Sequence, residues 1–377
     1  MAGTTVSHRD AKQLEHLLNS PEVVELVAGL KATRWTGRPG YPIRAMVGMA
    51  LAKSLYTLPT WTRTVALVRE HAALRAALGC ADDVAAVPSV YACYRFTVKL
   101  HNFKPLLDAC IASVLDGLHD ELPELGEHVA IDGSDLPAYA NGQRYVSKGG
   151  KLRERFSDPD ASWGHRSAIS TRKGGGFYGY KLHAAVCTAT GLPVAWETHT
   201  AKDAEVPVVP SLLDSLADLG IRPAVCIADK GYDVAPFYDA CESRDIRPVA
   251  PLRQTPFVKA GKAAPPSCDH GVWTFAGSDT KRGAAKYRCP SGECSPRSVW
   301  VKADRLHTLI PRETARWRKL YKSRAGVERE FGRLKHEWAL LPLRVRGVER
   351  VRLHADLTIL SRLAVALAKA RAIPLAA

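Results

Sequence analysis

The pattern of apolar and polar positions changes near residue 120 and divides the chain into two parts. Between residues 41 and 120, apolar side chains recur at the spacing of amphipathic helices. After residue 120 come short runs rich in β-branched residues, and two of them, EHVAID and AVCIAD, end in an aspartate. A hairpin pattern over 177–188 and 192–199 lies between them. The order strand, hairpin, helix, strand, helix and strand predicts an α/β fold with a mixed sheet flanked by helices.

These changes in pattern predict four segments. An insertion is indicated where Pro, Gly and Cys accumulate around isolated β pieces at 272–275 and 299–301. Residues 141–176 are rich in Gly and Arg without a clear period, which predicts a basic loop. The segments are an α-helical N-terminal region at 1–120, the first part of the α/β core at 121–251, an inserted β-rich subdomain at 252–311 and the C-terminal part of the core at 312–377.

A helix predicted over 314–338 carries two separate stripes. On a helical wheel with Glu328 at zero, Arg324 falls at about −40°, Tyr321 at about +20° and Lys335 at about −20°. This polar stripe is typical of a solvated face with i,i+4 ion pairs, or of a carboxylate that holds a metal ion beside phosphate-binding cations. A second stripe is apolar and can pack on a core; it contains Leu320, Val327, Phe331, Leu334 and Trp338.

The net charge of the chain indicates what kind of partner it binds. The 377 residues contain 53 Lys and Arg against 38 Asp and Glu, a formal net charge of +15. Such a surplus favours a polyanion, most commonly nucleic acid, although ribosome-associated and membrane-surface proteins are equally basic. Residues 312–352 hold 13 Lys and Arg and 5 Asp and Glu, which gives 13 − 5 = +8. Over half of the surplus therefore surrounds the helix with the two stripes.

The sequence favours a cytoplasmic protein. The first ten residues contain no apolar segment of the kind found in secretory signals. The apolar run near the C-terminus is interrupted by Arg362, Lys369 and Arg371, so it predicts a packed helix rather than a membrane span. The nine Cys, an odd number, are expected to be reduced thiols in the cytoplasm.

The spacing Y-x2-R-x3-E-x6-K, formed by Tyr321, Arg324, Glu328 and Lys335, resembles the signature of the DDE transposases of bacterial insertion sequences. The resemblance implies a ribonuclease-H-like core in which Glu328 is the third carboxylate of a metal-binding triad. The first two carboxylates must then lie at strand ends upstream, and the two aspartates that end apolar runs are in those places. They are Asp132, which precedes Asp229 by 97 residues, and Asp229, which precedes Glu328 by 99 residues.

Three carboxylates in one site repel each other, so they need cations in order to ionise together. Hard oxygen ligands suit Mg²⁺ or Mn²⁺, and two such ions can activate a hydroxyl group and stabilise a leaving oxygen. The resemblance therefore implies that Asp132, Asp229 and Glu328 hold two Mg²⁺ or Mn²⁺ ions and catalyse DNA cleavage and strand transfer at the ends of an insertion sequence. Two alternatives stay open: a ribonuclease-H-like nuclease without strand transfer, and a catalytically idle DNA-binding derivative.

Three neighbouring carboxylates are predicted to take no part in this chemistry. Asp135 and Asp233 follow the two strand ends and are interpreted as turn residues. Glu330 lies about 200° around the helix from Glu328. There it is expected to pair with Arg333 or with a neighbouring helix.

The partner implied by the resemblance is double-stranded DNA, both transposon ends and target, bound by a homodimer. Arg324 and Lys335 are expected to hold phosphates, and Tyr321 to stack on a base or to form a hydrogen bond. The motif G-x-K-x-H at the hairpin places Lys181 and His183 on one strand face, either towards DNA or towards solvent. The helical N-terminal region would either grip the DNA ends or form a dimerisation bundle.

Four metal-ligand residue types fall in the predicted insertion: Cys268, His270, Cys289 and Cys294. Their spacing, C-x-H followed by C-x4-C, departs from the C-x2-C pairs that are usual in zinc sites. Free buried thiols are therefore the expectation at these cysteines, and zinc binding is left open.

Overall fold

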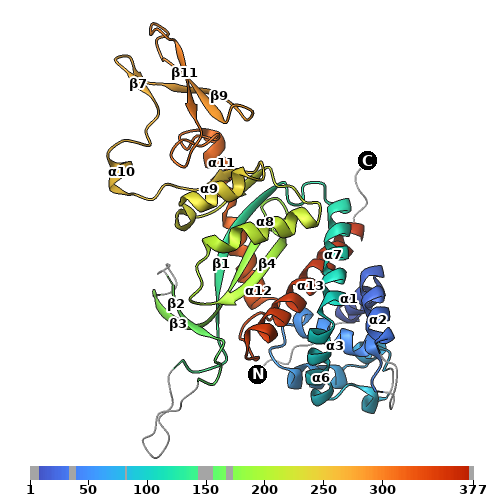
Figure 1. Cartoon of the computed structure of the whole chain (residues 1–377). Helices are drawn as coiled ribbons and strands as arrows, with labels where there is room; N and C mark the ends of the chain where they lie inside the picture. Colours follow the sequence, from blue (N-terminus) through green and yellow to red (C-terminus); the bar gives the residue numbers. More distant parts are fainter. Residues whose placement is uncertain (1–7, 34–39, 81–82, 143–155, 167–172, 373–377) are drawn as a thin grey trace, which may run out of the picture.

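The computed structural model describes residues 8–33, 40–80, 83–142, 156–166 and 173–372. Most of the predicted basic loop at 141–176 lies outside these ranges. The chain forms a helical bundle, a sheet covered by helices and a β-rich subdomain that projects from the sheet (Figure 1). None of the helices in the described ranges is both long and apolar enough to cross a membrane.

The N-terminal bundle is built around one helix that is buried on nearly all sides. This helix, α3, is apolar almost all round, and Gly48 within it allows a close approach, since a Cβ there would lie 2.1 Å from Leu78 Cδ2. Pro21 occupies the first turn of α2, where the missing N–H costs nothing. The elements are α1 His8–Asn19, α2 Pro21–Ala32, α3 Ile43–Leu55, α4 Trp61–Glu70, α5 Ala72–Leu78, η1 Val84–Ala86, α6 Val90–Asn102 and α7 Lys104–Glu121.

The sheet contains the strands β1 His128–Pro137, β2 Ser162–Arg166, β3 Gly175–Cys187, β4 Pro193–Thr200, β5 Val225–Ile227 and β6 Arg247–Val249. Their order is β2-β3-β1-β5-β6, and β4 also pairs with β3. The neighbours of β3 are all antiparallel to it, whereas β1, β5 and β6 run parallel. The series β4-β3-β1-β5-β6, three antiparallel strands followed by two parallel ones, forms a ribonuclease-H-like mixed sheet, as the sequence predicts, and β2 pairs with the first part of β3. The predicted hairpin is β3 and β4.

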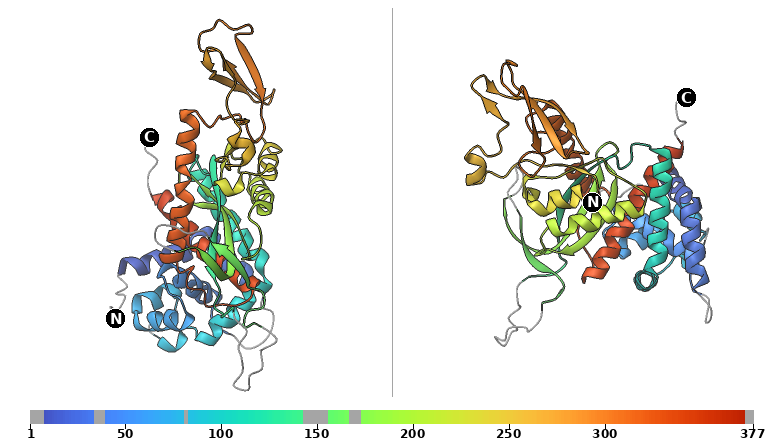
Figure 2. Two further views of the ribbon diagram at one scale, coloured as in Figure 1. Left: turned by 90° about the vertical axis from the view of Figure 1, so that its left-hand side faces the viewer. Right: turned by 45° about the horizontal axis from the view of Figure 1, so that its top comes forward.

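Helices cover both faces of this sheet, as the turned view of Figure 2 shows. One side carries η2 Val206–Val208, α8 Val209–Asp218 and α9 Ala235–Glu242, and the other carries α11 Ala315–Ser323 and α12 Ala325–His336. The apolar stripe predicted for the last of these helices packs into the core, with Val327, Phe331 and Leu334 buried. The final helix, α13 Val348–Ala372, packs against β4 on one side and against α3 and α7 on another, so it joins the sheet to the bundle.

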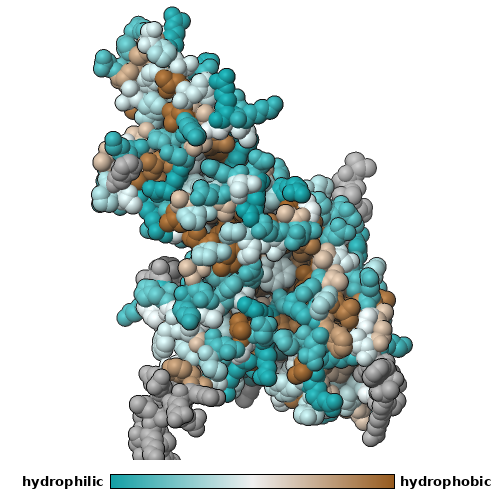
Figure 3. Space-filling model, viewed as in Figure 1, coloured by the Kyte–Doolittle hydropathy of each residue, from teal (hydrophilic) through white to brown (hydrophobic). Residues whose placement is uncertain are grey.

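The insertion consists of α10 Pro256–Lys259, β7 Ser267–Cys268, β8 Gly271–Val272, β9 Thr274–Asp279, β10 Ala284–Arg288 and β11 Ser298–Lys302. Strands β9, β10 and β11 form an antiparallel sheet, and β7 and β8 form a separate hairpin. Its hydrophobic cluster is separate from the main core and contains only four buried residues, Trp273, Ala285, Tyr287 and Cys289. In the view of Figure 3 its surface is mainly hydrophilic.

Candidate active site

Two aspartates from adjacent parallel strands meet at one edge of the sheet. Ala130 of β1 pairs with Ile227 of β5, and Asp132 and Asp229 each follow two residues later. Because β1 and β5 are parallel and in register, the same offset brings both carboxylates to the edge where β5 ends, the side on which α/β sheets bind ligands. The sequence predicts that Asp132 ends its strand, but β1 continues to Pro137 because it still pairs with β3 there. Asp229 also caps the short helix η3 Lys230–Tyr232 by accepting a hydrogen bond of 2.6 Å from the backbone N–H of Gly231. The structure therefore brings these two predicted residues together.

Arg324 links the third predicted carboxylate to the first. Its Nη2 donates to Oδ2 of Asp132 at 2.8 Å, and its Nη1 donates to Oε1 of Glu328 at 2.7 Å. Burial lowers the pKa of the Arg324 guanidinium, but the negative charges of Asp132, Glu328 and Asp229 outweigh this effect and raise it. One guanidinium therefore experiences all three carboxylates, although they lie 97 and 99 residues apart in the sequence.

The charge state of Asp132 depends on its surroundings. Burial raises the pKa of Asp132 to about 7, and the charges of Asp229 and Glu205 add to this rise. The guanidinium of Arg324 and the backbone N–H of Gly133 oppose it. A carboxyl group in this position is stabilised in its ionised form by further positive charge. Carboxylate oxygens are the donors that Mg²⁺ and Mn²⁺ prefer, so the chemistry of Asp132 and Asp229 suits a divalent cation.

Tyr321 lies beside the same carboxylates. Burial raises the pKa of its hydroxyl group, Arg324 lowers it, and the charges of Asp229, Glu328 and Asp132 raise it further. One face of its ring is stacked on Trp317, with centroids 5.0 Å apart and an interplanar angle of 17°. Lys335, the last residue of the predicted stripe, is partly buried in the last turn of α12. The ring of Tyr321 is thus partly covered, while its hydroxyl group belongs to the polar cluster.

Two residues of this cluster were not singled out from the sequence. Glu205 follows β4, and its Oε1 accepts a hydrogen bond of 2.9 Å from Lys181 Nζ. A Cβ at Gly133 would lie 3.2 Å from the same oxygen, so Glu205 lies close to the face of β1 that carries Gly133, opposite the face that carries Asp132. Its charge nevertheless contributes to raising the pKa of Asp132. Tyr232 is fully buried, and Glu205, Asp132 and Asp229 all contribute to raising its pKa. Tyr232 stands in the motif ADKGY, but Glu205 reaches the site only through the packing of the loop after β4.

Lys181 and His183 lie on one face of β3, as the alternation predicts, but His183 is buried. In the sheet, His183 pairs with Gly133 whereas Asp132 pairs with Ala184, so both β3 side chains point to the face opposite Asp132. His183 is only 1% exposed, and its ring contacts that of His199 at a centroid distance of 5.6 Å. It therefore faces neither DNA nor solvent in this structure. The ring of His199 contacts it, and Glu205 lies close to the same position of β1.

The two aspartates interpreted as turn residues have different positions. Asp135 lies inside β1, because β3 continues to pair with β1 as far as Pro137 after β5 has ended. Asp233 does follow a strand end, but its side chain is fully buried and binds the insertion. It accepts hydrogen bonds from the Tyr238 hydroxyl at 2.8 Å, the Arg253 backbone N–H at 2.7 Å and Arg305 Nη1 at 2.6 Å.

Comparisons with known proteins agree with this topology. Residues 123–363 match the family described as "Transposase DDE domain", and residues 6–96 match the family described as "Transposase domain (DUF772)". Among curated proteins, none matches this sequence significantly. A cryo-EM structure of a piggyBac transposase synaptic complex with hairpin DNA is similar at a TM-score of 0.43, with 13% identity over 98% of this chain and 77% of that chain.

A structural likeness this remote carries no argument about chemistry, whereas the first sequence match covers well over half of the chain. Members of the matched family cut DNA and transfer it, generally with divalent metal ions. The chain therefore belongs to the transposases with a DDE domain that insertion sequences encode.

Proposed function

We propose that this transposase cuts DNA at the ends of its insertion sequence and joins them to a target, with Asp132, Asp229 and Glu328 as its catalytic carboxylates. The observation that supports this assignment most strongly is the convergence of the three charges on Arg324. Residues so distant in sequence would not surround one side chain if the polar stripe of the helix were only a solvated face.

The same three residues are proposed to hold two Mg²⁺ or Mn²⁺ ions. Such ions, when bound, activate the attacking hydroxyl group and stabilise the leaving oxygen of a phosphodiester. Arg324 binds one oxygen each of Asp132 and Glu328. A cation held by these carboxylates would compete with the guanidinium, which would then be available to a DNA phosphate. Glu205 is proposed as a further acid at the edge of this site.

The helical bundle is proposed to contact the DNA ends. The exposed face of α6 carries Tyr91, Tyr94 and Val98, with Arg95 over the ring of Tyr91 and Lys99 over the ring of Phe103. Cations alternating with aromatic rings can bind both phosphates and bases. Action on two transposon ends favours two copies of the protein, so a homodimer on DNA is proposed. A role of the bundle in dimerisation remains the alternative to DNA binding. A cytoplasmic location remains a prediction from the sequence.

The test uses the purified full chain and labelled DNA that carries the inverted repeats flanking its gene. Wild-type protein with Mg²⁺ should cut at the repeats and join the ends to a plasmid. Asp132→Asn, Asp229→Asn and Glu328→Gln should each abolish cutting while end binding is retained, and Ca²⁺ should support binding without cutting. Full activity in any of the three variants would refute the site assignment.

The same assay separates the alternative functions. Cut ends that are never joined to the plasmid would indicate a nuclease. Binding without cutting in any divalent cation would indicate an idle derivative. Joined products that depend on all three carboxylates would support the transposase.

A further inference from the structure

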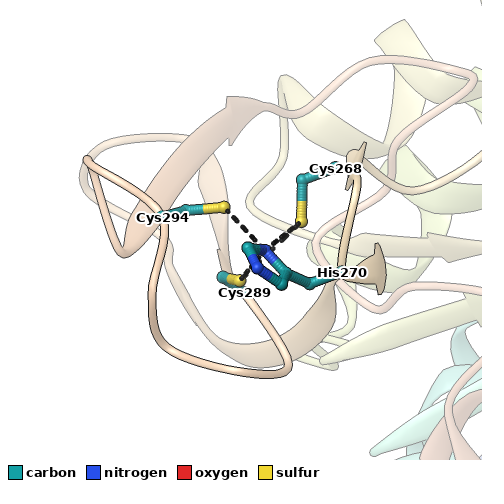
Figure 4. Close-up of side chains that lie close together, drawn as sticks. All are labelled: Cys268, His270, Cys289 and Cys294. Atoms are coloured by element: carbon teal, nitrogen blue, oxygen red, sulfur yellow. Dashed lines mark hydrogen bonds between the residues drawn. The ribbon is translucent and has the colours of Figure 1, made fainter.

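Four side chains of the insertion converge on one point outside the active site. Cys268 ends β7, His270 lies in the turn between β7 and β8, Cys289 follows β10, and Cys294 lies in the loop before β11. One potential ligand atom of each residue lies within 4.8 Å of the others. Figure 4 shows the three sulfur atoms and the ring nitrogen pointing towards a common centre.

The spacing of these atoms is that of a coordination tetrahedron. His270 Nδ1 lies 3.9 Å from Cys268 Sγ, 3.9 Å from Cys289 Sγ and 3.6 Å from Cys294 Sγ. The sulfur atoms of Cys268 and Cys289 are 3.7 Å apart. Tetrahedral Zn²⁺ with its usual bond lengths places two sulfur ligands about 3.8 Å apart, and a sulfur and a nitrogen about 3.6 Å apart. We propose that Cys268, His270, Cys289 and Cys294 bind a structural Zn²⁺ ion that holds the insertion together.

The orientation of His270 supports this assignment. Its Nδ1 faces the three sulfur atoms, and its Nε2 lies 3.0 Å from Oε2 of Glu293. Metal-bound histidines commonly donate their second ring N–H to a carboxylate, which fixes the tautomer and makes the other nitrogen a better ligand. Glu293 directly precedes Cys294, so one loop supplies both a ligand and this hydrogen-bond acceptor.

The insertion also needs a stabilising element of this kind. Its hydrophobic cluster contains four buried residues, and small β-structures with so few buried side chains are rarely stable alone. The ligands come from both parts of the subdomain: Cys268 and His270 from the β7–β8 hairpin, and Cys289 and Cys294 from the end of the three-stranded sheet. A metal ion bound to all four residues joins the hairpin to the sheet.

The geometry distinguishes this site from other uses of cysteine. A disulfide requires sulfur atoms about 2.05 Å apart, much closer than those of Cys268 and Cys289. Four protein ligands leave no open position for water or substrate, so the ion would be structural rather than catalytic. The expectation of free buried thiols from the sequence does not fit either, because Cys268 and Cys294 are partly exposed. The C-x-H spacing suits the site because Cys268 and Gly271 pair across a tight hairpin turn.

The first test measures metal content in the full chain purified without added metal or strong chelator. Elemental analysis should find about one zinc per chain in the wild type and in a control variant, Cys80→Ser, whose thiol lies in the helical bundle. Cys268→Ser and Cys294→Ser should lose most of this zinc. Wild-type protein that neither contains nor takes up zinc would overturn the proposal, as would both variants retaining it.

A second test does not depend on the variants folding. Wild-type protein loaded with Co²⁺ in place of zinc should show the intense visible bands of tetrahedral cobalt and a thiolate charge-transfer band. Chelation should make 252–311 sensitive to protease before the rest of the chain. Octahedral cobalt spectra, an iron-containing coloured protein or a Cys268–Cys289 disulfide would each refute the zinc site. Asp132→Asn should keep its zinc, so this result is independent of the proposed active site.

Discussion

Glu328 and Glu330 lie two residues apart on α12, yet the side chain of Glu328 is 59% exposed whereas that of Glu330 is fully buried. Glu328 contacts Arg324 in the proposed active site. Glu330 contacts Arg333 at 3.4 Å and Arg362 of α13 at 2.9 Å. The pairing of Glu330 agrees with the sequence prediction, but its burial makes the interaction structural rather than a weak surface contact.

Substitution of these two residues should therefore separate catalysis from stability. Glu328→Gln should abolish DNA cleavage with little change in the midpoint of urea unfolding, because the side chain is exposed. Glu330→Gln should cost on the order of 3 kcal/mol of unfolding free energy, since it leaves Arg362 largely buried without its carboxylate.

The control for this pair is the double variant Glu330→Leu/Arg362→Met, which removes both charges. It should be less destabilised than Glu330→Gln. Cleavage retained in Glu328→Gln but lost in stably folded Glu330→Gln would mean that the third carboxylate is misassigned.

Arg324→Ala should weaken DNA binding only when a divalent cation is present. Without the cation, the guanidinium is engaged by Asp132 and Glu328 and has no free charge for DNA. With Ca²⁺, which permits binding without cutting, the substitution should reduce the slope of log affinity against log salt by about 1, as expected for the loss of one phosphate contact.

Lys335→Ala is the matched comparison, because Lys335 is the other cation of the predicted phosphate-binding stripe. It should lower the slope to a similar extent with and without Ca²⁺. An equal effect of Arg324→Ala under both conditions would show that this arginine is not shared between the carboxylates and the phosphate.

Tyr321→Phe should reduce the rate of cleavage but not the affinity for DNA ends. The substitution keeps the stacking on Trp317 and removes only the hydroxyl group that lies among the carboxylates. The readouts are single-turnover cleavage and equilibrium binding in Ca²⁺. A loss of affinity with an unchanged cleavage rate would instead support stacking of this ring on a base.

The buried His183 should make the protein less stable in mild acid. Burial lowers its pKa to about 4, with contributions from His199 and Lys181 that exceed the opposing effects of Glu197 and Asp203. Above pH about 6.5 the ring is neutral in both states; below it the unfolded chain binds a proton that the folded chain does not, so stability falls. Between pH 7 and 5.5 this residue should cost about 1 kcal/mol.

Urea unfolding at the two pH values, compared between wild type and His183→Gln, measures this contribution. The variant should lose less stability on acidification than the wild type does. Equal losses would mean that His183 is protonated in the folded protein.

The sequence by itself determined the local elements and the chemistry that they carry. Apolar runs ending in Asp132 and Asp229 predicted two buried strands, because a strand buried on both faces has a nearly continuous apolar sequence. Helical periodicity placed Tyr321, Arg324 and Glu328 on one stripe of a single helix over 314–338. The structure divides this helix into α11 and α12 at Arg324, which keeps helical φ and ψ, so the i,i+4 hydrogen bond from Arg324 to Glu328 still forms.

Only the tertiary structure decided which side chains meet across these elements. The register of β3 against β1 turned His183 away from Asp132, and the packing of α13 buried Glu330. The loop after β4 brought Glu205 close enough to Asp132 to contribute to raising its pKa, and the folding of the insertion brought Cys268 and Cys294 together. Such contacts depend on sheet register and on helix packing over long sequence separations, and periodicity within one element contains no information about its neighbours.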